Sequence, residues 1–412
     1  MVLVKRVLFI ILSVFLFFVV IPVDALSTNS KNIFLYNLDT NEKVFGYKDN
    51  EKVSIASLTK IMTAVVALEN IDNLDKEVII TNDMLKGLKE KEAFVVGLEV
   101  GQKVSYRELL YACVVASGAD ATNAIAISMS GSVDKFVSLM NNKAKELQLS
   151  NTSFANPIGF DDKNNYSTVE EVAILLKYAL KNDTFKQIFT TDLYEFKDKS
   201  ITVKSSMREG GKHANIDTSM ILGAKTGYDI DAGRCLASIA YDKKNDINYL
   251  LVTTGADDDY NKMYNVKDAY ELYTYFFTNY SYHTLVEKNS EIIKISTRYL
   301  KDDFVTFKSL EEIKLLYNNN DFDRNNIKYS YTGIKEIKPF TKKGSKLGVL
   351  DVYYKDKLIK SIDIVLENKP GISVIKVIKG EWFTILSVLI FTFSLVVFIF
   401  TLKKFLKAYK RY

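Results

Sequence analysis

Hydrophobic and polar positions change their period several times along the chain, and each change predicts an element. Two short strand-like runs, 31–36 and 43–47, flank the polar turn Asp39-Thr40-Asn41. Apolar residues then recur at helical spacing in 61–68, 109–129, 133–147 and 169–180. Strand patterns return at 201–203, 225–226, 235–241 and 249–254, followed by a helix at 268–280. Strands at both ends of a helical middle predict an α+β domain, with an antiparallel sheet beside a cluster of helices.

The pattern becomes one of short alternating strands between about residues 287 and 375, with polar turns between them. The expected strands are 291–296, 305–307, 328–331, 347–354 and 359–366. An Asn- and Asp-rich stretch, 316–326, is expected to be a loop. This part of the chain predicts a small β-sandwich domain, 287–375, after a first domain that covers 26–283.

The N-terminal segment 1–25 has the layout of a secretory signal peptide. Lys5 and Arg6 precede an apolar stretch at 7–21, and Val23-Asp24-Ala25 is a small-residue cleavage site. An uncleaved membrane anchor is the alternative for this segment.

A second apolar segment, 382–402, contains no charged residue and has the length of a membrane-spanning helix. The basic tail 403–412 follows at once, and the positive-inside rule places such a tail in the cytoplasm. We therefore expect a single-pass C-terminal anchor in a bacterial cell membrane, with the body of the protein outside the cytoplasm.

Charge and composition exclude several classes of function. The net charge is +5, and the tail together with Lys5 and Arg6 accounts for that excess, so no basic surface for nucleic acid is expected. The chain has two cysteines and two histidines, too few for a disulfide framework. Because neither histidine lies in a zinc-ligand or catalytic signature, we expect no metal and no other cofactor.

Three short motifs carry the candidate chemistry: Ser57-Leu58-Thr59-Lys60, Ser117-Gly118-Ala119 and Lys225-Thr226-Gly227. Ser57 and Lys60 are three residues apart, which places both side chains on one face at the start of a helix. A desolvated lysine there could accept the proton of a serine nucleophile. The first motif alone is equally compatible with an N-cap serine that is followed by a lysine one turn later.

The other two motifs favour the catalytic interpretation. Lys225-Thr226-Gly227 on a strand edge offers a cation, a hydroxyl and an uncrowded backbone, which suit a substrate with a free carboxylate. Ser117 is expected in a loop between two apolar helical runs, where its hydroxyl could face the same cleft. Three such motifs in this order are typical of penicillin-binding proteins and class A β-lactamases.

The chain resembles the low-molecular-mass penicillin-binding proteins, which are serine-type D-alanyl-D-alanine carboxypeptidases. The likeness includes 55–63, 109–118, 156–168 and 223–233, and covers about residues 30–280, with a weaker likeness beyond. It implies a β-lactamase/DD-peptidase-like domain. It also implies removal of the terminal D-Ala from peptidoglycan stem pentapeptides, with β-lactam antibiotics as inhibitors.

The resemblance also assigns roles to individual residues. Ser57 would be the nucleophile, Lys60 the general base and Ser117 the proton relay. Lys225 and Thr226 would hold the terminal carboxylate on the strand that also carries Gly227 and Tyr228. The backbone N–H groups of Ser57 and Tyr228 would form the oxyanion hole.

Two positions depart from the family pattern. Ala119 stands where the second motif normally has asparagine, and Ile158 stands where a histidine is common. They motivate one alternative, a peptidoglycan-binding protein with impaired catalysis. The others are a DD-endopeptidase and a β-lactamase, although Glu170 and Glu171 are expected in a helix instead of a deacylation loop.

Overall fold

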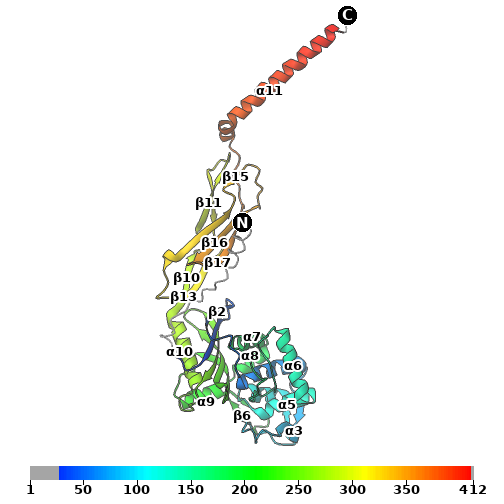
Figure 1. The fold of residues 1–412 in the computed structure, drawn as a ribbon, viewed down its shortest axis with the longest axis vertical. Coiled ribbons are helices and arrows are strands. Elements are labelled where there is room, and N and C mark those ends of the chain that lie inside the picture. The colour runs from blue at the N-terminus through cyan, green and yellow to red at the C-terminus, as the bar shows by residue number, and fades with distance from the viewer. Residues whose placement is uncertain (1–26, 410–412) are drawn as a thin grey trace, which may run out of the picture. The chain divides into compact units, whose positions relative to one another are not determined.

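The computed structural model describes residues 27–409, and the chain divides into two compact units, Met1–Thr278 and Asn279–Tyr412 (Figure 1). The expected signal peptide, 1–25, lies outside the described residues.

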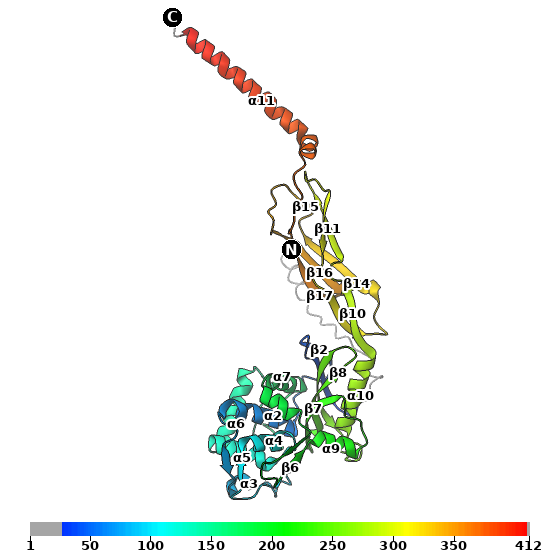
Figure 2. The same ribbon diagram turned by 180° about the vertical axis from the view of Figure 1, so that it is seen from behind.

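A five-stranded antiparallel sheet in the order β2-β1-β9-β8-β7 forms the centre of the first unit. Its strands are β1 (Asn32–Asn37), β2 (Glu42–Tyr47), β7 (Ile221–Asp229), β8 (Gly233–Asp242) and β9 (Ile247–Ala256). Figure 2 shows α10 (Tyr264–Asn279) on one side of this sheet and the other large helices on the opposite side. The structure therefore confirms the expected α+β layout, in which the chain closes the sheet by returning β9 beside β1.

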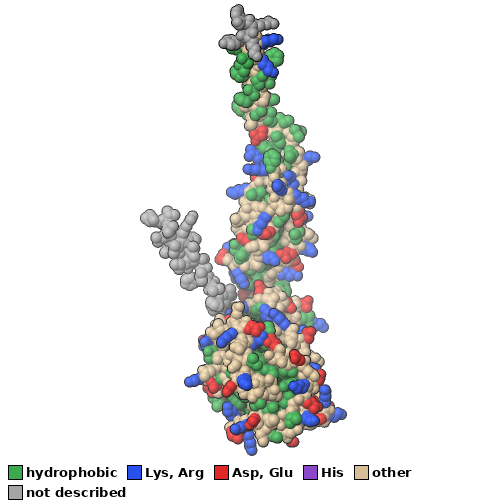
Figure 3. All heavy atoms as spheres, turned by 90° about the vertical axis from the view of Figure 1, so that its right-hand side faces the viewer, with side chains coloured by type: hydrophobic (Ala, Val, Ile, Leu, Met, Phe, Trp, Pro, Cys, Tyr) green, Lys and Arg blue, Asp and Glu red, His purple; other side chains and the backbone are tan. Residues whose placement is uncertain are grey.

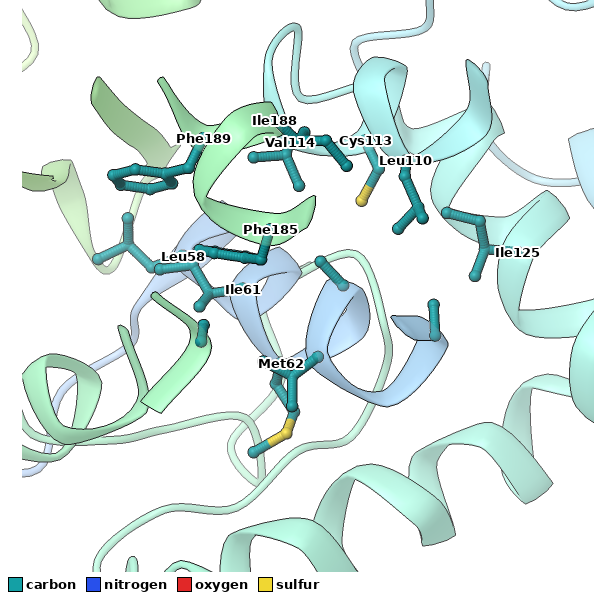
Figure 4. Packing of buried hydrophobic residues seen from close by; sticks show 14 of the residues in the cluster. Leu58, Ile61, Met62, Leu110, Cys113, Val114, Ile125, Phe185, Ile188 and Phe189 are labelled. Atoms are coloured by element: carbon teal, nitrogen blue, oxygen red, sulfur yellow. The ribbon is translucent and has the colours of Figure 1, made fainter. Parts of the chain in front are cut away.

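The helical part is built around α2 (Lys60–Asn70), whose first eight residues are all buried. A helix that is apolar on every side must lie inside the domain, so its start is held rigidly by neighbours. Leu58, Ile61 and Met62 pack with side chains from α4 and α8 in the main core (Figure 4). The other helices are α3 (Asn82–Leu85), α4 (Tyr106–Val114), α5 (Ala119–Ser130), α6 (Val133–Glu146), α7 (Val169–Ala179), α8 (Asp183–Phe189) and α9 (Ser206–His213).

The expected helical stretch 109–129 is two helices, α4 and α5, because the chain breaks at 115–118. Ser117 has a φ of +68°, which a helix cannot contain, and Gly118 caps α5. The break places Ser117 in a loop, as expected. Two short antiparallel strand pairs, β3 (Glu77–Ile79) with β4 (Lys103–Ser105) and β5 (Leu193–Glu195) with β6 (Thr202–Lys204), complete the unit.

The second unit is β-rich, as expected. One sheet, in the order β14-β16-β17, packs against the sheet β12-β11-β15 and the pair β10-β13, with a hydrophobic cluster in each interface. The strands are β10 (Tyr280–Val286), β11 (Glu291–Thr297), β12 (Phe304–Lys308), β13 (Ile313–Asn318), β14 (Ile327–Gly333), β15 (Glu336–Ile337), β16 (Lys346–Tyr354) and β17 (Lys357–Val365). The expectation of a loop over all of 316–326 was wrong, because 316–318 complete β13 by pairing with β10.

The last element is α11 (Val374–Tyr409), with a kink at Glu381. Its part Val374–Lys407 is long and apolar enough to cross a membrane, by length and composition. Figure 3 shows hydrophobic side chains gathered along this helix. The Tyr299 hydroxyl donates to the Glu381 carboxylate at 2.5 Å, and the Ser373 N–H donates to the Tyr299 carbonyl at 2.8 Å, so the helix start is tied to the β-rich domain.

Candidate active site

The first motif forms a close serine–lysine pair. Ser57 lies in a 3-10 turn, Ala56–Thr59, immediately before α2, and Lys60 is the first residue of that helix. The spacing of three residues brings the Lys60 Nζ to 2.7 Å from the Ser57 Oγ. The same Nζ donates to the Ile158 carbonyl at 2.7 Å.

Lys60 is 1% exposed, and its burial decides its protonation. Desolvation lowers the pKa of Lys60 to about 8, against the opposing influence of Cys113 and Asp120. A lysine with this pKa is neutral in an appreciable fraction near pH 7 and can accept a proton from Ser57.

The second and third motifs meet in another serine–lysine contact. The Lys225 Nζ donates to the Ser117 Oγ at 2.8 Å and to the Thr226 carbonyl at 2.6 Å. Lys225 is completely buried, and desolvation, followed by the charge of Lys60, lowers its pKa well below the usual range. The two lysines are therefore electrostatically coupled, and protonation of one disfavours protonation of the other.

Strand β7 passes directly against the backbone of Ser57. A Cβ at Gly227 would lie 3.2 Å from the Ser57 nitrogen and 3.3 Å from the Ala56 Cβ. The glycine of the third motif therefore permits the approach that brings the backbone of β7 beside the Ser57 N–H.

Thr226 has a partner that sequence reasoning missed. Its Oγ1 lies 2.6 Å from the Ser206 Oγ, at the start of α9. The two hydroxyls form a polar pair, and the Ser206 N–H donates to the Val115 carbonyl at 3.2 Å, near the loop that carries Ser117. Ser206 lies in no recognised motif, and the Ser205-Ser206 pair before a helix is only a capping signal in sequence.

Tyr228 presents its side chain to a separate polar group. It is 46% exposed, and the guanidinium of Arg234 lies 5.2 Å from the centre of its ring. A hydrogen bond to Asp258 raises the pKa of the Tyr228 hydroxyl. Arg234 also forms an ion pair with Asp258 at 2.7 Å, so the end of β7 is anchored by charged contacts.

The loop that carries Ile158 is shaped by Asn156 and Gly159. The Asn156 Oδ1 accepts from the N–H groups of Ile158, Gly159 and Phe160, at 3.2, 2.7 and 2.9 Å. Gly159 has a φ of +90°, and a Cβ there would lie 1.9 Å from the Ala56 carbonyl oxygen. Ala56 itself has a φ of +44°, so the backbone before Ser57 is strained and supported by this loop.

Asp120, next to the second motif, is a structural carboxylate that sequence reasoning also missed. It is 1% exposed and accepts from the N–H groups of Val96, Gly97 and Leu98 at 3.0–3.1 Å. The Ala119 N–H donates to the Phe94 carbonyl at 2.8 Å. These bonds hold the segment 94–98 beside the start of α5.

Other candidate chemistry finds no support in the described part of the chain. No group of three potential metal-ligating side chains occurs within residues 27–409. Cys113 and Cys235 are both free and buried. Glu171, on α7, accepts from Asn151 and Thr152 within its own region, so the expectation of a helical, structural glutamate is confirmed.

Comparison with known proteins agrees with this geometry. Residues 20–258 match the family described as D-alanyl-D-alanine carboxypeptidase, and residues 280–370 match the C-terminal domain of penicillin-binding protein 5. The chain is 30% identical to the D-alanyl-D-alanine carboxypeptidase DacF of Bacillus subtilis over 87% of this chain and 91% of that protein. It is 26% identical to a D-alanyl-D-alanine endopeptidase of Escherichia coli, over 60% of this chain and 77% of that protein.

The fold has a counterpart among solved structures. Penicillin-binding protein 5 from Haemophilus influenzae superimposes with a TM-score of 0.60 at 23% identity, over 84% of this chain and 98% of that one. The match spans both units, so the fold is that of penicillin-binding protein 5. From the family matches and the DacF relationship together, the chain belongs to the D-alanyl-D-alanine carboxypeptidases, the serine peptidases that act on peptidoglycan.

Proposed function

We propose that this carboxypeptidase removes the terminal D-Ala of peptidoglycan stem pentapeptides through an acyl-enzyme on Ser57. One observation carries the assignment of the nucleophile: the Ser57 Oγ lies 2.7 Å from a buried lysine nitrogen. Burial lowers the pKa of Lys60 to about 8, so the amine is neutral often enough to accept a proton, while the charges of Cys113 and Asp120 keep it basic.

In the first step, the Ser57 Oγ attacks the carbonyl carbon of the penultimate D-Ala as its proton moves to the Lys60 Nζ. The backbone N–H groups of Ser57 and Tyr228 stabilise the oxyanion. The approach of Gly227 to the Ser57 nitrogen supports this pairing, because Tyr228 is the next residue of the strand.

Collapse of the tetrahedral intermediate breaks the peptide bond and requires a proton for the leaving amine. Ser117 supplies this proton and is replenished through Lys225, whose nitrogen is 2.8 Å from the hydroxyl. Thr226 binds the terminal carboxylate, and Ser206 orients the threonine hydroxyl from 2.6 Å away. The proton that Lys60 took from Ser57 restores the Ser117–Lys225 pair. Water then attacks the ester as Lys60 takes its proton, and that proton returns to the Ser57 Oγ when the shortened stem peptide leaves.

β-Lactam antibiotics react at the same atom. Their strained amide acylates Ser57, and the ring-opened leaving group stays attached, so the ester persists. Inhibition and turnover therefore share the acylation of Ser57, and both depend on Lys60.

The protein is anchored by α11, which spans the bacterial cell membrane once. The apolar segment 382–402 and the lysines at 403, 404 and 407 support this topology, with the tail in the cytoplasm and the peptidase and β-rich domains outside it. A cleaved signal peptide at 1–25 remains a prediction of the sequence.

The test is the intact mass of the full-length protein in detergent after incubation with benzylpenicillin, beside Ser57→Ala. A stable adduct of one penicillin that the variant lacks supports the nucleophile, and D-Ala release from a pentapeptide then measures turnover. No adduct with intact penicillin would favour a binding protein without catalysis, and penicillin consumed without an adduct would favour a β-lactamase. Release of D-Ala only from cross-linked peptides would favour the endopeptidase.

A further inference from the structure

The Ile158 side chain lies in a buried cluster that is separate from the main core and includes Ala119, the last residue of the second motif. Its buried members are Leu88, Ala119 and Ile158, at 3%, 2% and 4% exposure, with Ala93 and Phe160 packed against them. Ala119 and Ile158, the two positions that depart from the family pattern, therefore lie in the same apolar cluster.

Ile158 also touches the reacting groups through its backbone. Its carbonyl accepts from the Lys60 Nζ at 2.7 Å, and the Lys60 Nζ in turn is 2.7 Å from the Ser57 Oγ. Ala119 follows Ser117-Gly118 directly and is the first residue of α5. The cluster therefore joins the loop that holds the general base to the helix start beside the proton relay.

We propose that the packing of Ile158 with Ala119 and Leu88 is the positioning device of this active site: it fixes the Ile158 carbonyl on Lys60 and keeps water from the lysine. This inference rests on the proposed role of Lys60.

The packing acts on Lys60 through the Ile158 carbonyl. A carbonyl fixed at 2.7 Å holds the ammonium or amine in one rotamer, which keeps its lone pair aimed at Ser57. Ile158, whose carbonyl accepts from Lys60, is itself only 4% exposed, so its packing limits the access of water to this hydrogen bond. The charged or titratable groups that act on Lys60 are Cys113 from α4, Asp120 from α5 and Lys225 from β7.

The variants Ile158→Ala and Ala119→Val test the cluster because they change its volume in opposite directions. Removing part of Ile158 leaves a cavity, and enlarging Ala119 overpacks the cluster. Each should slow acylation of full-length protein by benzylpenicillin roughly tenfold, whereas the double variant should recover most of the rate, as coupled residues do. The matched control is Ile188→Ala, in the main core on α8.

The pH profile separates positioning from simple loss of folded protein. Water admitted by Ile158→Ala reduces the desolvation of Lys60 and raises its pKa, so the rising limb of the acylation rate should move to higher pH. Ile188→Ala should lower the stability of the fold without shifting the pH dependence of the acylation rate.

Additive effects of the two substitutions, or a slowed rate with an unmoved limb, would overturn the positioning role while leaving Ser57 as the nucleophile. Ala119→Asn provides an independent check: an amide in the apolar cluster should slow acylation and shift the limb in the same direction. A wild-type protein that forms no adduct would contradict the proposed function itself and would be recognised before any variant is compared.

Discussion

The Lys225 ammonium nitrogen and the Ser117 hydroxyl lie 2.8 Å apart although 108 residues separate them in the chain. Lys225 is a buried residue of the edge strand β7. Ser117 lies in the break between α4 and α5, where its own backbone is left-handed. Their contact joins the sheet to the helical cluster at the point where, in the proposed mechanism, the leaving group is protonated. An amine buried at this junction serves reactivity more than stability.

Replacing Lys225 by methionine should therefore separate activity from stability. Lys225→Met keeps the volume of the side chain and removes a buried amine, so the thermal midpoint should stay the same or rise. Acylation by benzylpenicillin should fall about 100-fold, the loss typical of one positioned donor. Lys204→Met, on the exposed face of β6, is the control and should leave the rate unchanged. A Lys225→Met variant whose thermal midpoint falls together with its acylation rate would contradict this prediction.

Gly159 should be irreplaceable even by alanine. Gly159→Ala forces a Cβ to within 1.9 Å of the Ala56 oxygen, so the turn before Ser57 must move. We expect a loss of at least about 2 kcal/mol in the free energy of unfolding and no acyl-enzyme. Gly131→Ala shares a positive φ but has open space around its Cβ, so it should cost only about 1 kcal/mol and acylate normally. Denaturant titrations and intact mass measure both effects.

The acylation rate should depend on the protonation of Lys60. Because Lys60 must be neutral to accept the serine proton, the rate should rise with pH and level off near its pKa of about 8. Measurement of the benzylpenicillin acylation rate between acidic and alkaline pH gives this limb directly. A rate that is flat across neutral pH would exclude Lys60 as the base.

The same pKa has a consequence for stability. Burial holds the pKa of Lys60 in the folded protein below its unfolded value of 10.5, so the unfolded state binds more protons between about pH 8 and 10.5. The contribution of Lys60 to stability should therefore rise with pH across this window. In denaturant titrations, the stability of Lys60→Met should rise less with pH than that of the wild type. Lys225, whose pKa is also lowered, contributes to the remaining rise.

Asp120 should matter for both the loop at 94–98 and the base. Asp120→Asn loses charge-assisted bonds to three backbone N–H groups, and we expect a loss of about 3 kcal/mol in the free energy of unfolding. Because the Asp120 charge raises the pKa of Lys60, the acylation limb should move to lower pH in this variant. Asp134→Asn, exposed in the first turn of α6, should change neither quantity. A shift of the acylation rate's rising limb to higher pH would contradict the electrostatic effect of Asp120 on Lys60.

Removal of α11 beyond Gly380 should release the protein from the membrane. The shortened chain keeps the β-rich domain and the active site, so it should bind penicillin and appear in the soluble fraction. The full chain, fractionated in parallel, should stay with the membrane until detergent is added. A shortened chain that remains membrane-bound through its first residues would instead indicate an uncleaved N-terminal anchor.

Local patterns in the sequence were sufficient to predict most elements. The strands β1 and β2 around their turn, the helices α6 and α7, and the apolar segment of α11 were predicted because hydrophobic period depends on neighbouring residues alone. The strand β13 was missed because its Asn-rich end resembles a loop and only pairing with β10 makes it a strand. Helix α10 begins four residues before its predicted start, since helix ends are decided by contacts as well as by pattern.

The sequence by itself determined the three motifs, their order and the serine–lysine spacing, because a gap of three residues on a helical turn is a local geometry. Only the tertiary structure decided which distant groups meet them: the Ile158 carbonyl on Lys60, the Ser206 hydroxyl on Thr226, and Gly159 beneath Ala56. It also decided the pKa values, because desolvation depends on everything packed around an amine. Burial and long-range contact are properties of the folded chain, and no pattern of nearby residues contains them.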